Sequence, residues 1–387
     1  MRGERIDRGD PPPVLVIGNP GDRRTRLFEK AVWDAWGRPA RLLPWSDVLA
    51  DPVRLAEAVD ETTIVRIDSP GDDFLVWRKL VAMGAQDRRT EVSTSIAEDE
   101  AQALSPELGR VRFLRQWYLG WCRALESIAT TLAAHPPRSV MNPPDAIRLC
   151  FDKDAVHEVL RTHGLPRPER LAGIASFDQL RDTMRNARWS QVFVKPCHAS
   201  TASGVIALRC SDRGTIAITS LEQVSRPTEW HFYNSFKVRR YDREADVARA
   251  VDFILGEGAV VERWIPKLTV GDSAVDVRVV VIDGHPLHTV ARASRRPITN
   301  LHLRSRRLAG DDIRRRIGDS AWEAGLHSAA AASRACGCGY SGIDLLFDPT
   351  GRHAILEVNA FGDLLPGLLH RGRDTYTSEI EMLGRVA

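Results

Sequence analysis

Three side chains near the C-terminal end of the sequence carry the oxygen donors that a metal ion needs. Asp344 interrupts the apolar run 343–347, Glu357 interrupts the run 354–358, and Asn359 follows directly. Side chains alternate between the two faces of a strand, so Glu357 and Asn359 point to the same side. Carboxylate and amide oxygens, with no Cys or His among them, suit a hard cation such as Mg²⁺. The pattern predicts a magnesium site; the alternative is a pair of solvent-facing acids on an edge hairpin.

A hairpin is the element that must bring these residues together. Residues 348–351 read DPTG, and this turn is favoured because Pro presets φ and Gly accepts a positive φ. If residues 349–352 form the loop, Asp348 pairs with His353, and counting back places Asp344 opposite Glu357. An unpaired carboxylate in an apolar strand is costly, so both acids need a partner.

Two lysines upstream are candidates for binding an anion. Lys153 lies inside a helix predicted from Asp145 to Gly164, and Lys195 ends a strand predicted over 191–196. The loop 197–204 reads CHASTASG, and backbone N–H groups exposed in such a small-residue loop can hold phosphate oxygens. The hydroxyl groups of this loop offer further donors, and they belong to Ser200, Thr201 and Ser203.

Two arginines lie on a second predicted hairpin. Its strands cover 276–282 and 287–293, joined by the strong turn signal Asp283-Gly284. Arg278 alternates with apolar residues on the first strand, and Arg292 lies near the end of the second. Guanidinium groups in such places can stabilise negative charge that develops during a reaction, or they can form salt bridges on a sheet face.

The combination resembles the ATP-grasp superfamily over about residues 145–368. The resemblance is closest to the branch with ribosomal-protein glutamate ligase and glutathione synthetase. It implies that Lys153 and Lys195 contact the phosphates of ATP, together with the loop residues Ser200, Ser203 and Gly204. It implies that a hinge strand holds the adenine through Glu262, Arg263, Trp264 and Ile265. Arg278 and Arg292 then match the catalytic arginines, and Asp344, Glu357 and Asn359 match the ligands of two Mg²⁺ ions, which Mn²⁺ can replace.

The elements along the chain predict an α/β and α+β fold, with a Rossmann-like α/β domain before two α+β subdomains of the ATP-grasp type. Strands alternate with helices over residues 13–140, which is typical of a small parallel sheet with a helical extension. The expected boundaries are a disordered leader (1–12), the N-terminal domain (13–140), a linker with the first ATP-grasp segment (141–190), a small lid subdomain (191–262) and a C-terminal subdomain with the metal site (263–387).

Composition excludes several classes of protein. The chain has 387 residues with 43% hydrophobic and 27% charged residues, which is typical of a globular protein with real cores. No apolar run approaches the ~18–20 residues that span a membrane. A net charge of +3 gives no case for nucleic acid, and six scattered cysteines indicate a reducing compartment, so we expect a cytoplasmic protein. A homo-oligomer is compatible with this composition.

The activity that the resemblance implies is ligation of a carboxylate to an amine through an acyl-phosphate, on a small acid or a peptide. Two other functions stay open: an ATP-binding regulator without ligation, and a phosphotransferase on the same fold. The arginine-rich segment 292–316 either binds an acidic substrate or is a solvated surface, and Asn300 lies in a region where relatives place an asparagine near the phosphates. His198 is either a substrate contact or a solvated loop residue.

Overall fold

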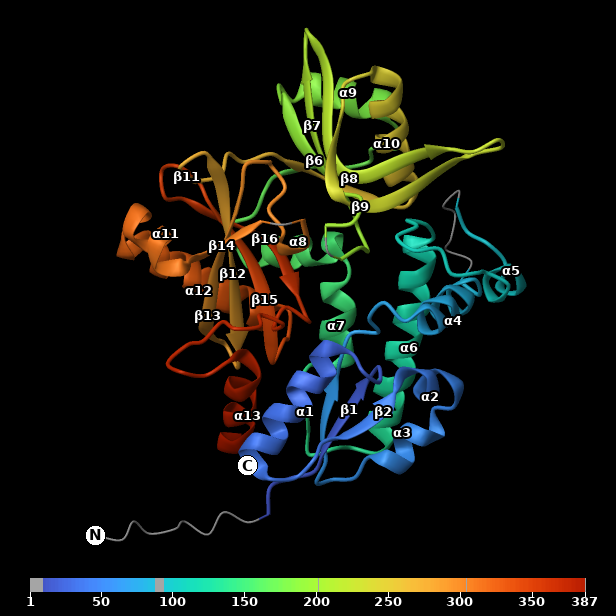
Figure 1. Cartoon of the computed structure of the whole chain (residues 1–387), viewed down its shortest axis with the longest axis vertical. Coiled ribbons are helices and arrows are strands. Elements are labelled where there is room, and N and C mark those ends of the chain that lie inside the picture. Colours follow the sequence, from blue (N-terminus) through green and yellow to red (C-terminus); the bar gives the residue numbers. More distant parts are fainter. Residues whose placement is uncertain (1–9, 88–93, 201, 304, 387) are drawn as a thin grey trace.

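Three β-sheets organise the chain, and each carries its own helices (Figure 1). The computed structural model describes residues 10–87, 94–200, 202–303 and 305–386. Most of the predicted leader, Thr201 of the small-residue loop and Arg304 of the arginine-rich segment lie outside these residues.

The first sheet is parallel, with strand order β2-β1-β3-β4. It forms because short apolar strands alternate with helices, as in the fully buried β1. Its strands are β1 (Val14–Gly18), β2 (Arg41–Pro44), β3 (Ile64–Ile67) and β4 (Ser139–Val140). The helices of this part of the chain are α1 (Arg23–Trp36), α2 (Trp45–Ala50), α3 (Val53–Ala58), α4 (Phe74–Gly84), α5 (Glu98–Gln102) and α6 (Leu114–Ala134). The long helix α6 runs from this sheet towards the second sheet (Figure 1).

The second sheet is antiparallel, with order β5-β10-β6-β7-β8-β9. Its strands are β5 (Arg170–Leu171), β6 (Gln191–Pro196), β7 (Ile206–Ser211), β8 (Gly214–Ser225), β9 (Trp230–Tyr241) and β10 (Ala259–Arg263). Helices α9 (Phe177–Asn186) and α10 (Glu244–Gly256) pack their apolar residues against it. The long β8–β9 hairpin, which carries no strong sequence signal, extends away from the rest of the molecule (Figure 1).

The third sheet has the order β14-β13-β12-β15-β16, and β11 pairs with β12 beside it. Its strands are β11 (Thr269–Val270), β12 (Ser273–Ile282), β13 (His285–Ser294), β14 (Arg306–Ala309), β15 (Tyr340–Phe347) and β16 (His353–Asn359). The helical elements are η1 (Leu301–Leu303), α11 (Gly310–Ile317), α12 (Asp319–Ala335) and α13 (Thr375–Val386). Small residues of α12 pack on the sheet, and α13 lies beside α1 (Figure 1).

Between the first and second sheets, the helix predicted over 145–164 is divided into two. Helix α7 (Pro144–Cys150) ends before Asp152, and α8 (Lys153–Thr162) begins after it. The break occurs because the Asp152 carboxylate accepts hydrogen bonds from the backbone N–H groups of Asp154 (2.9 Å) and Ala155 (3.0 Å), which makes it an N-cap. Lys153 is therefore the first residue of a helix and not an interior one.

A buried charge cluster ties the first sheet to the C-terminal part of the chain. Arg66 on β3 is fully buried and donates to Asp68 (2.9 Å), Asp363 (2.6 Å) and Glu379 on α13 (2.5 Å). Arg24 of α1 also pairs with Asp363. Three carboxyl groups thus share two guanidinium groups, and burial raises the pKa of Glu379 to about 7 although Arg66 opposes the shift.

The domain boundaries at residues 140, 190 and 262 stay predictions, since sheet order does not define folding units.

Candidate active site

A cavity of about 480 Å³ collects most of the predicted site residues. The second sheet lines it with residues of β6 and β10, and the third sheet lines it with residues of β12, β13, β15 and β16. The predicted residues that line it are Lys153, Lys195, Ser200, Ser203, Glu262, Arg263, Ile265, Arg278, Arg292, Asp344, Glu357 and Asn359. Asn300 also lines the cavity, whereas His198 and the exposed arginines beyond Arg292 are not among its lining residues.

The two acids lie opposite each other, but the register that puts them there differs from the predicted one. His353 pairs with Phe347 and not with Asp348, so the turn is one residue longer on the β15 side. A β-bulge between Asp344 and Leu345 then restores the pairing of Asp344 with Glu357. A bulge adds one residue to one strand, and here it offsets the shift at the turn. Asn359 lies opposite Gly342, on the same side of β16 as Glu357.

Asp344 is held between the two predicted arginines. Arg278 Nε lies 2.5 Å from Asp344 Oδ1, and Arg292 Nη2 lies 3.0 Å from Oδ2. Burial alone would raise the pKa of Asp344, but Arg278 and Arg292 outweigh burial and hold it well below its usual range. Arg292 also donates from Nε to Asp276 Oδ1 at 2.7 Å. The carboxylate is therefore ionised, and it lies within contact distance of both cations.

Glu357 and Asn359 complete a set of oxygen donors. Glu357 is about one quarter exposed, with 27% of its side-chain surface accessible, and its Oε1 lies 3.0 Å from Lys153 Nζ. The Asn359 amide nitrogen donates to the Gly342 carbonyl at 3.2 Å, which turns the amide oxygen away from that bond. A carboxylate pair and an amide oxygen on rigid strands fit the ligand preference of Mg²⁺.

The two lysines also line the cavity, and acidic partners hold both. Lys153 Nζ donates to the Ala199 carbonyl at 2.6 Å besides its contact with Glu357. Lys195 Nζ donates to Glu262 Oε2 at 2.5 Å, and Arg170 donates to the other oxygen of Glu262 at 3.2 Å. Burial would raise the pKa of Glu262, but the neighbouring cations lower it, so the group is ionised.

Two predicted binding residues, Gly204 and Trp264, do not line the cavity. Gly204 has a φ of +69°, and a Cβ there would lie 2.7 Å from Ile254 Cδ1, so its glycine serves the turn and its packing. The Trp264 ring packs against Phe193, with ring centroids 4.9 Å apart. Arg263 lines the cavity, but it is exposed and pairs with Glu169 at 2.7 Å.

The sequence pattern does not reveal a second buried charge group on the cavity wall. Lys267 Nζ lies 3.0 Å from Asp276 Oδ2, and the Thr299 hydroxyl bonds to both side chains. Asp276 thereby joins Lys267 to Arg292. An acid two residues before Arg278 was the only available signal, because Lys267 and Thr299 belong to loops without a motif. The cavity also reaches the first-sheet part of the chain, where Asp22 and Arg24 at the start of α1 and residues 69–72 line it.

No family model matches the sequence, and no curated protein matches it. Solved structures do match along nearly the whole chain. The D-cycloserine synthetase DcsG has 14% identity and a TM-score of 0.54, covering 96% of this chain and 99% of that chain. The macrocyclase MdnC, bound with precursor peptide MdnA from Microcystis aeruginosa, has 14% identity and a TM-score of 0.53, covering 97% and 100%. The ATP-grasp ligase PsnB, complexed with minimal precursor, Mg and ADP, has 15% identity and a TM-score of 0.51, covering 96% of each chain. At such identities the likeness concerns the fold.

Proposed function

We propose that this protein, whose chain has the ATP-grasp fold, is an ATP-dependent ligase that joins a carboxylate to an amine. One observation supports this most: two lysines, two arginines and an acid–acid–amide set line a single cavity. A protein that only bound nucleotide would not need the paired arginines and the oxygen donors on the same wall.

No helix among the described residues is long and apolar enough to cross a bilayer.

In the proposed complex, Lys153 and Lys195 bind the phosphates of ATP. ATP carries about four negative charges, and two ammonium groups reduce its repulsion with an incoming carboxylate. Both lysines are held by acids in this structure, at 3.0 Å from Glu357 and 2.5 Å from Glu262. The lysines and carboxylates of the site thus neutralise one another when no nucleotide is bound. In the proposed complex, the lysines bind the phosphates instead.

Asp344, Glu357 and Asn359 would hold the Mg²⁺ ions that accompany the nucleotide. When bound, these ions neutralise the phosphates and align the γ-phosphoryl group for transfer. The residues fit this task because all three offer oxygen donors from two adjacent strands of one sheet.

The reaction that we propose has two steps. An oxygen of the substrate carboxylate attacks the γ-phosphorus and ADP leaves, which forms an acyl-phosphate. The amine then attacks the acyl carbon, phosphate leaves, and the amine nitrogen loses a proton. In this proposal, Arg278 and Arg292 stabilise the charge on the phosphoryl group and on the oxyanion.

The substrate that we propose is a small acid or a peptide, with an amine as the second substrate. The similar structures include one bound with a precursor peptide and one named a synthetase of D-cycloserine, so both size classes occur on this fold. Residues of the first-sheet part of the chain line the cavity, and they can contribute to acceptor binding.

The experiment is a screen of acids and amines with ATP and Mg²⁺, followed as ADP, phosphate and product mass. We expect turnover to ADP and phosphate with one acceptor pair, and its loss in Glu357→Gln. The matched control is Glu158→Gln on α8, whose carboxylate is exposed and pairs with Arg161. Release of AMP and pyrophosphate would reject the acyl-phosphate route. ADP with a stable phosphorylated product would indicate a phosphotransferase, and nucleotide binding without turnover would indicate a regulator.

A further inference from the structure

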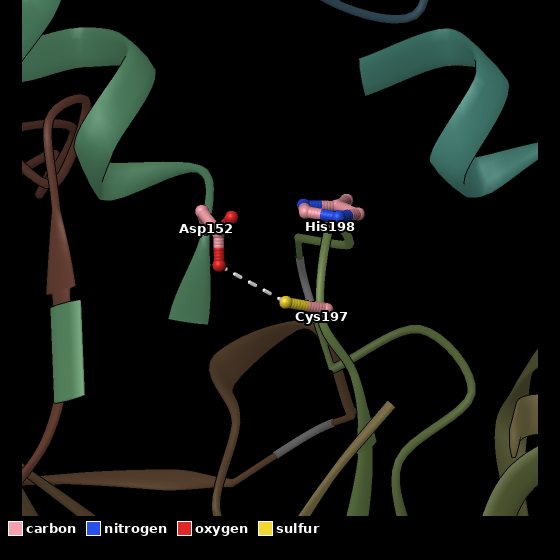
Figure 2. Close-up of side chains that lie close together, drawn as sticks. All are labelled: Asp152, Cys197 and His198. Carbon is pink, nitrogen blue, oxygen red and sulfur yellow. Dashed lines mark hydrogen bonds between the residues drawn. The ribbon is translucent and has the colours of Figure 1, made fainter. Parts of the chain in front are cut away.

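Three potential metal ligands lie together next to the two lysines in the chain. The proposed reaction does not use them. Asp152 caps α8, and Cys197 and His198 follow β6 as the first two residues of the small-residue loop. One ligand atom from each of these side chains lies within 4.8 Å of the others (Figure 2). They come from segments about 45 residues apart in the sequence, so the tertiary structure assembles the group.

Asp152 offers one carboxylate oxygen to this group. Its Oδ1 accepts the two capping N–H groups of α8 and the Cys197 thiol at 3.2 Å. Its Oδ2 accepts no hydrogen bond from the part of the chain that the structure describes, and Figure 2 shows the second oxygen on the side of His198. Burial would raise the pKa of Asp152, but the backbone N–H of Ala155 and the other partners lower it, so the carboxylate is ionised.

His198 is a buried neutral imidazole with a fixed ring. It is 4% exposed, and its ring stacks on Tyr118 with centroids 3.8 Å apart and planes 6° from parallel. Its Nδ1 lies 3.2 Å from the Phe151 carbonyl, which can only accept, so Nδ1 donates the proton and Nε2 keeps its lone pair. Burial lowers the pKa of His198 to about 4. A metal-binding histidine is commonly oriented by such a hydrogen bond to a backbone carbonyl.

Cys197 is a buried thiol in the same group. Burial and the neighbouring carboxylate raise its pKa to about 12, which makes it a poor nucleophile. A divalent cation would replace the thiol proton, because the thiolate is the form that binds metals. The carboxylate and the thiolate together carry two negative charges, so a bound M²⁺ gives a neutral group that Lys153 does not repel.

We propose that Asp152, Cys197 and His198 form a binding site for a divalent cation of the zinc type. Thiolate, imidazole and carboxylate are ligands of Zn²⁺, whereas Mg²⁺ selects oxygen donors, so this site differs in chemistry from the acid–acid–amide set. Three protein ligands leave one position of a tetrahedral ion for a water molecule.

Such an ion would join the two segments that carry the lysines. Lys153 follows Asp152 directly, Lys195 precedes Cys197 by two residues, and the Lys153 N–H already donates to the Cys197 carbonyl at 3.3 Å. The bound cation therefore fixes the start of α8 against the turn after β6, and we expect it to raise the stability of this part of the protein.

The test uses the full-length chain, stripped of metal by a chelator and titrated with Co²⁺ as a spectroscopic probe. We expect one equivalent to bind, with a thiolate-to-cobalt charge-transfer band that excess Mg²⁺ does not remove. Cys197→Ser should abolish the band, and His198→Ala should weaken Co²⁺ binding by ~10-fold or more. The control is Cys210→Ser, because Cys210 is a half-buried thiol on β7 that contacts Met184 instead.

Absence of the charge-transfer band from the wild-type protein would overturn the proposal. So would a band that survives in Cys197→Ser and is lost in Cys338→Ser, because Cys338 lies 3.5 Å from Cys150 in a separate group of thiols that also includes Cys336. Thermal unfolding of the wild type gives a second test that needs no variant: one equivalent of Co²⁺ should raise its melting temperature, and an unchanged value would contradict the site. No nucleotide is present, so failure here leaves the ligase proposal untouched.

Discussion

Asp344→Asn is the substitution whose effect the structure predicts best. Asparagine keeps the size of the side chain and removes its charge, so packing changes little. The substituted carboxylate is the one that pairs with Arg278 at 2.5 Å and Arg292 at 3.0 Å. Both arginines are largely buried, with 16% and 6% of their side-chain surfaces exposed, so water cannot replace the lost partner.

The expected loss of stability is about 3 kcal/mol. Each charge pair attracts by roughly 6 kcal/mol at an effective dielectric constant near 20, but desolvation cancels much of this attraction. Breaking a buried pair from one side costs about 3–5 kcal/mol. We take the lower end because Arg292 keeps Asp276, 2.7 Å from its Nε.

The pH dependence of this loss has a definite sign. The pKa of Asp344 is lowered in the folded protein, so the ion pairs contribute fully above its ordinary value of about 4. Their contribution disappears as the pH falls further and the carboxylate takes up a proton. The difference between wild type and Asp344→Asn should therefore be constant at neutral pH and shrink in acid.

The assay is urea unfolding of wild type, Asp344→Asn, Arg278→Gln and the double variant, followed by tryptophan fluorescence. The double variant should be more stable than the sum of the single losses predicts, because the two side chains interact directly. Asp311→Asn on α11 is the control, since Asp311 is exposed and only a helix-end effect of about 0.3–1 kcal/mol is expected. A loss below about 1 kcal/mol, or strictly additive losses, would refute this account of Asp344.

Four further predictions follow from individual contacts. Gly342→Ala should lower the free energy of unfolding by at least about 1–3 kcal/mol and reduce turnover, because the new Cβ would lie 2.5 Å from the loop after β16. Gly384→Ala should stabilise helix α13 by about 0.5–1 kcal/mol, because nothing lies within 4 Å of the new Cβ. Thermal unfolding of both variants measures the two effects. Glu379 by itself should lower the stability by up to about 3 kcal/mol as the pH rises from 4.5 to 7, because its raised pKa favours its protonated form when folded. The lowered pKa values of His198 and His288 act in the opposite direction, and they do so in wild type and variant alike. Glu379→Gln should be free of this decrease and exceed the wild type at pH 8 in urea unfolding, and a parallel pH profile would contradict the assignment. Lys195→Ala should weaken ATP binding on the order of 10-fold or more by calorimetry, because a charged hydrogen bond contributes about 1.5–3 kcal/mol, whereas Lys237→Ala on β9 should have no effect.

Much of the fold could be predicted from local patterns. The apolar run of β1 and the Asp283-Gly284 turn appear where the sequence placed them, and the resemblance to ATP-grasp proteins is confirmed at the level of the fold. Such signals act over a few residues, where side-chain alternation and turn conformation decide the structure. The long hairpin of β8 and β9 was not predicted, because the buried positions of β8 begin with Thr215, Ala217 and Thr219, which give no apolar alternation.

Two local predictions were wrong for identifiable reasons. The helix over 145–164 is interrupted because the Asp152 carboxylate accepts hydrogen bonds from backbone N–H groups. The sequence pattern does not distinguish an acid that caps a helix from an acid inside one. The hairpin register was wrong at its turn, where His353 pairs with Phe347, although Asp344 still faces Glu357 after the bulge. The roles assigned to the site residues stay predictions.

The sequence by itself determined which residue types could do chemistry and which strands and helices carry them. Only the tertiary structure decided how they are partnered: Asp344 with two arginines, Lys195 with Glu262, and Asp152 with Cys197 and His198. Most of these pairs join residues more than 40 positions apart. Their contacts depend on how whole sheets and helices pack, and no short-range preference of the chain encodes that packing.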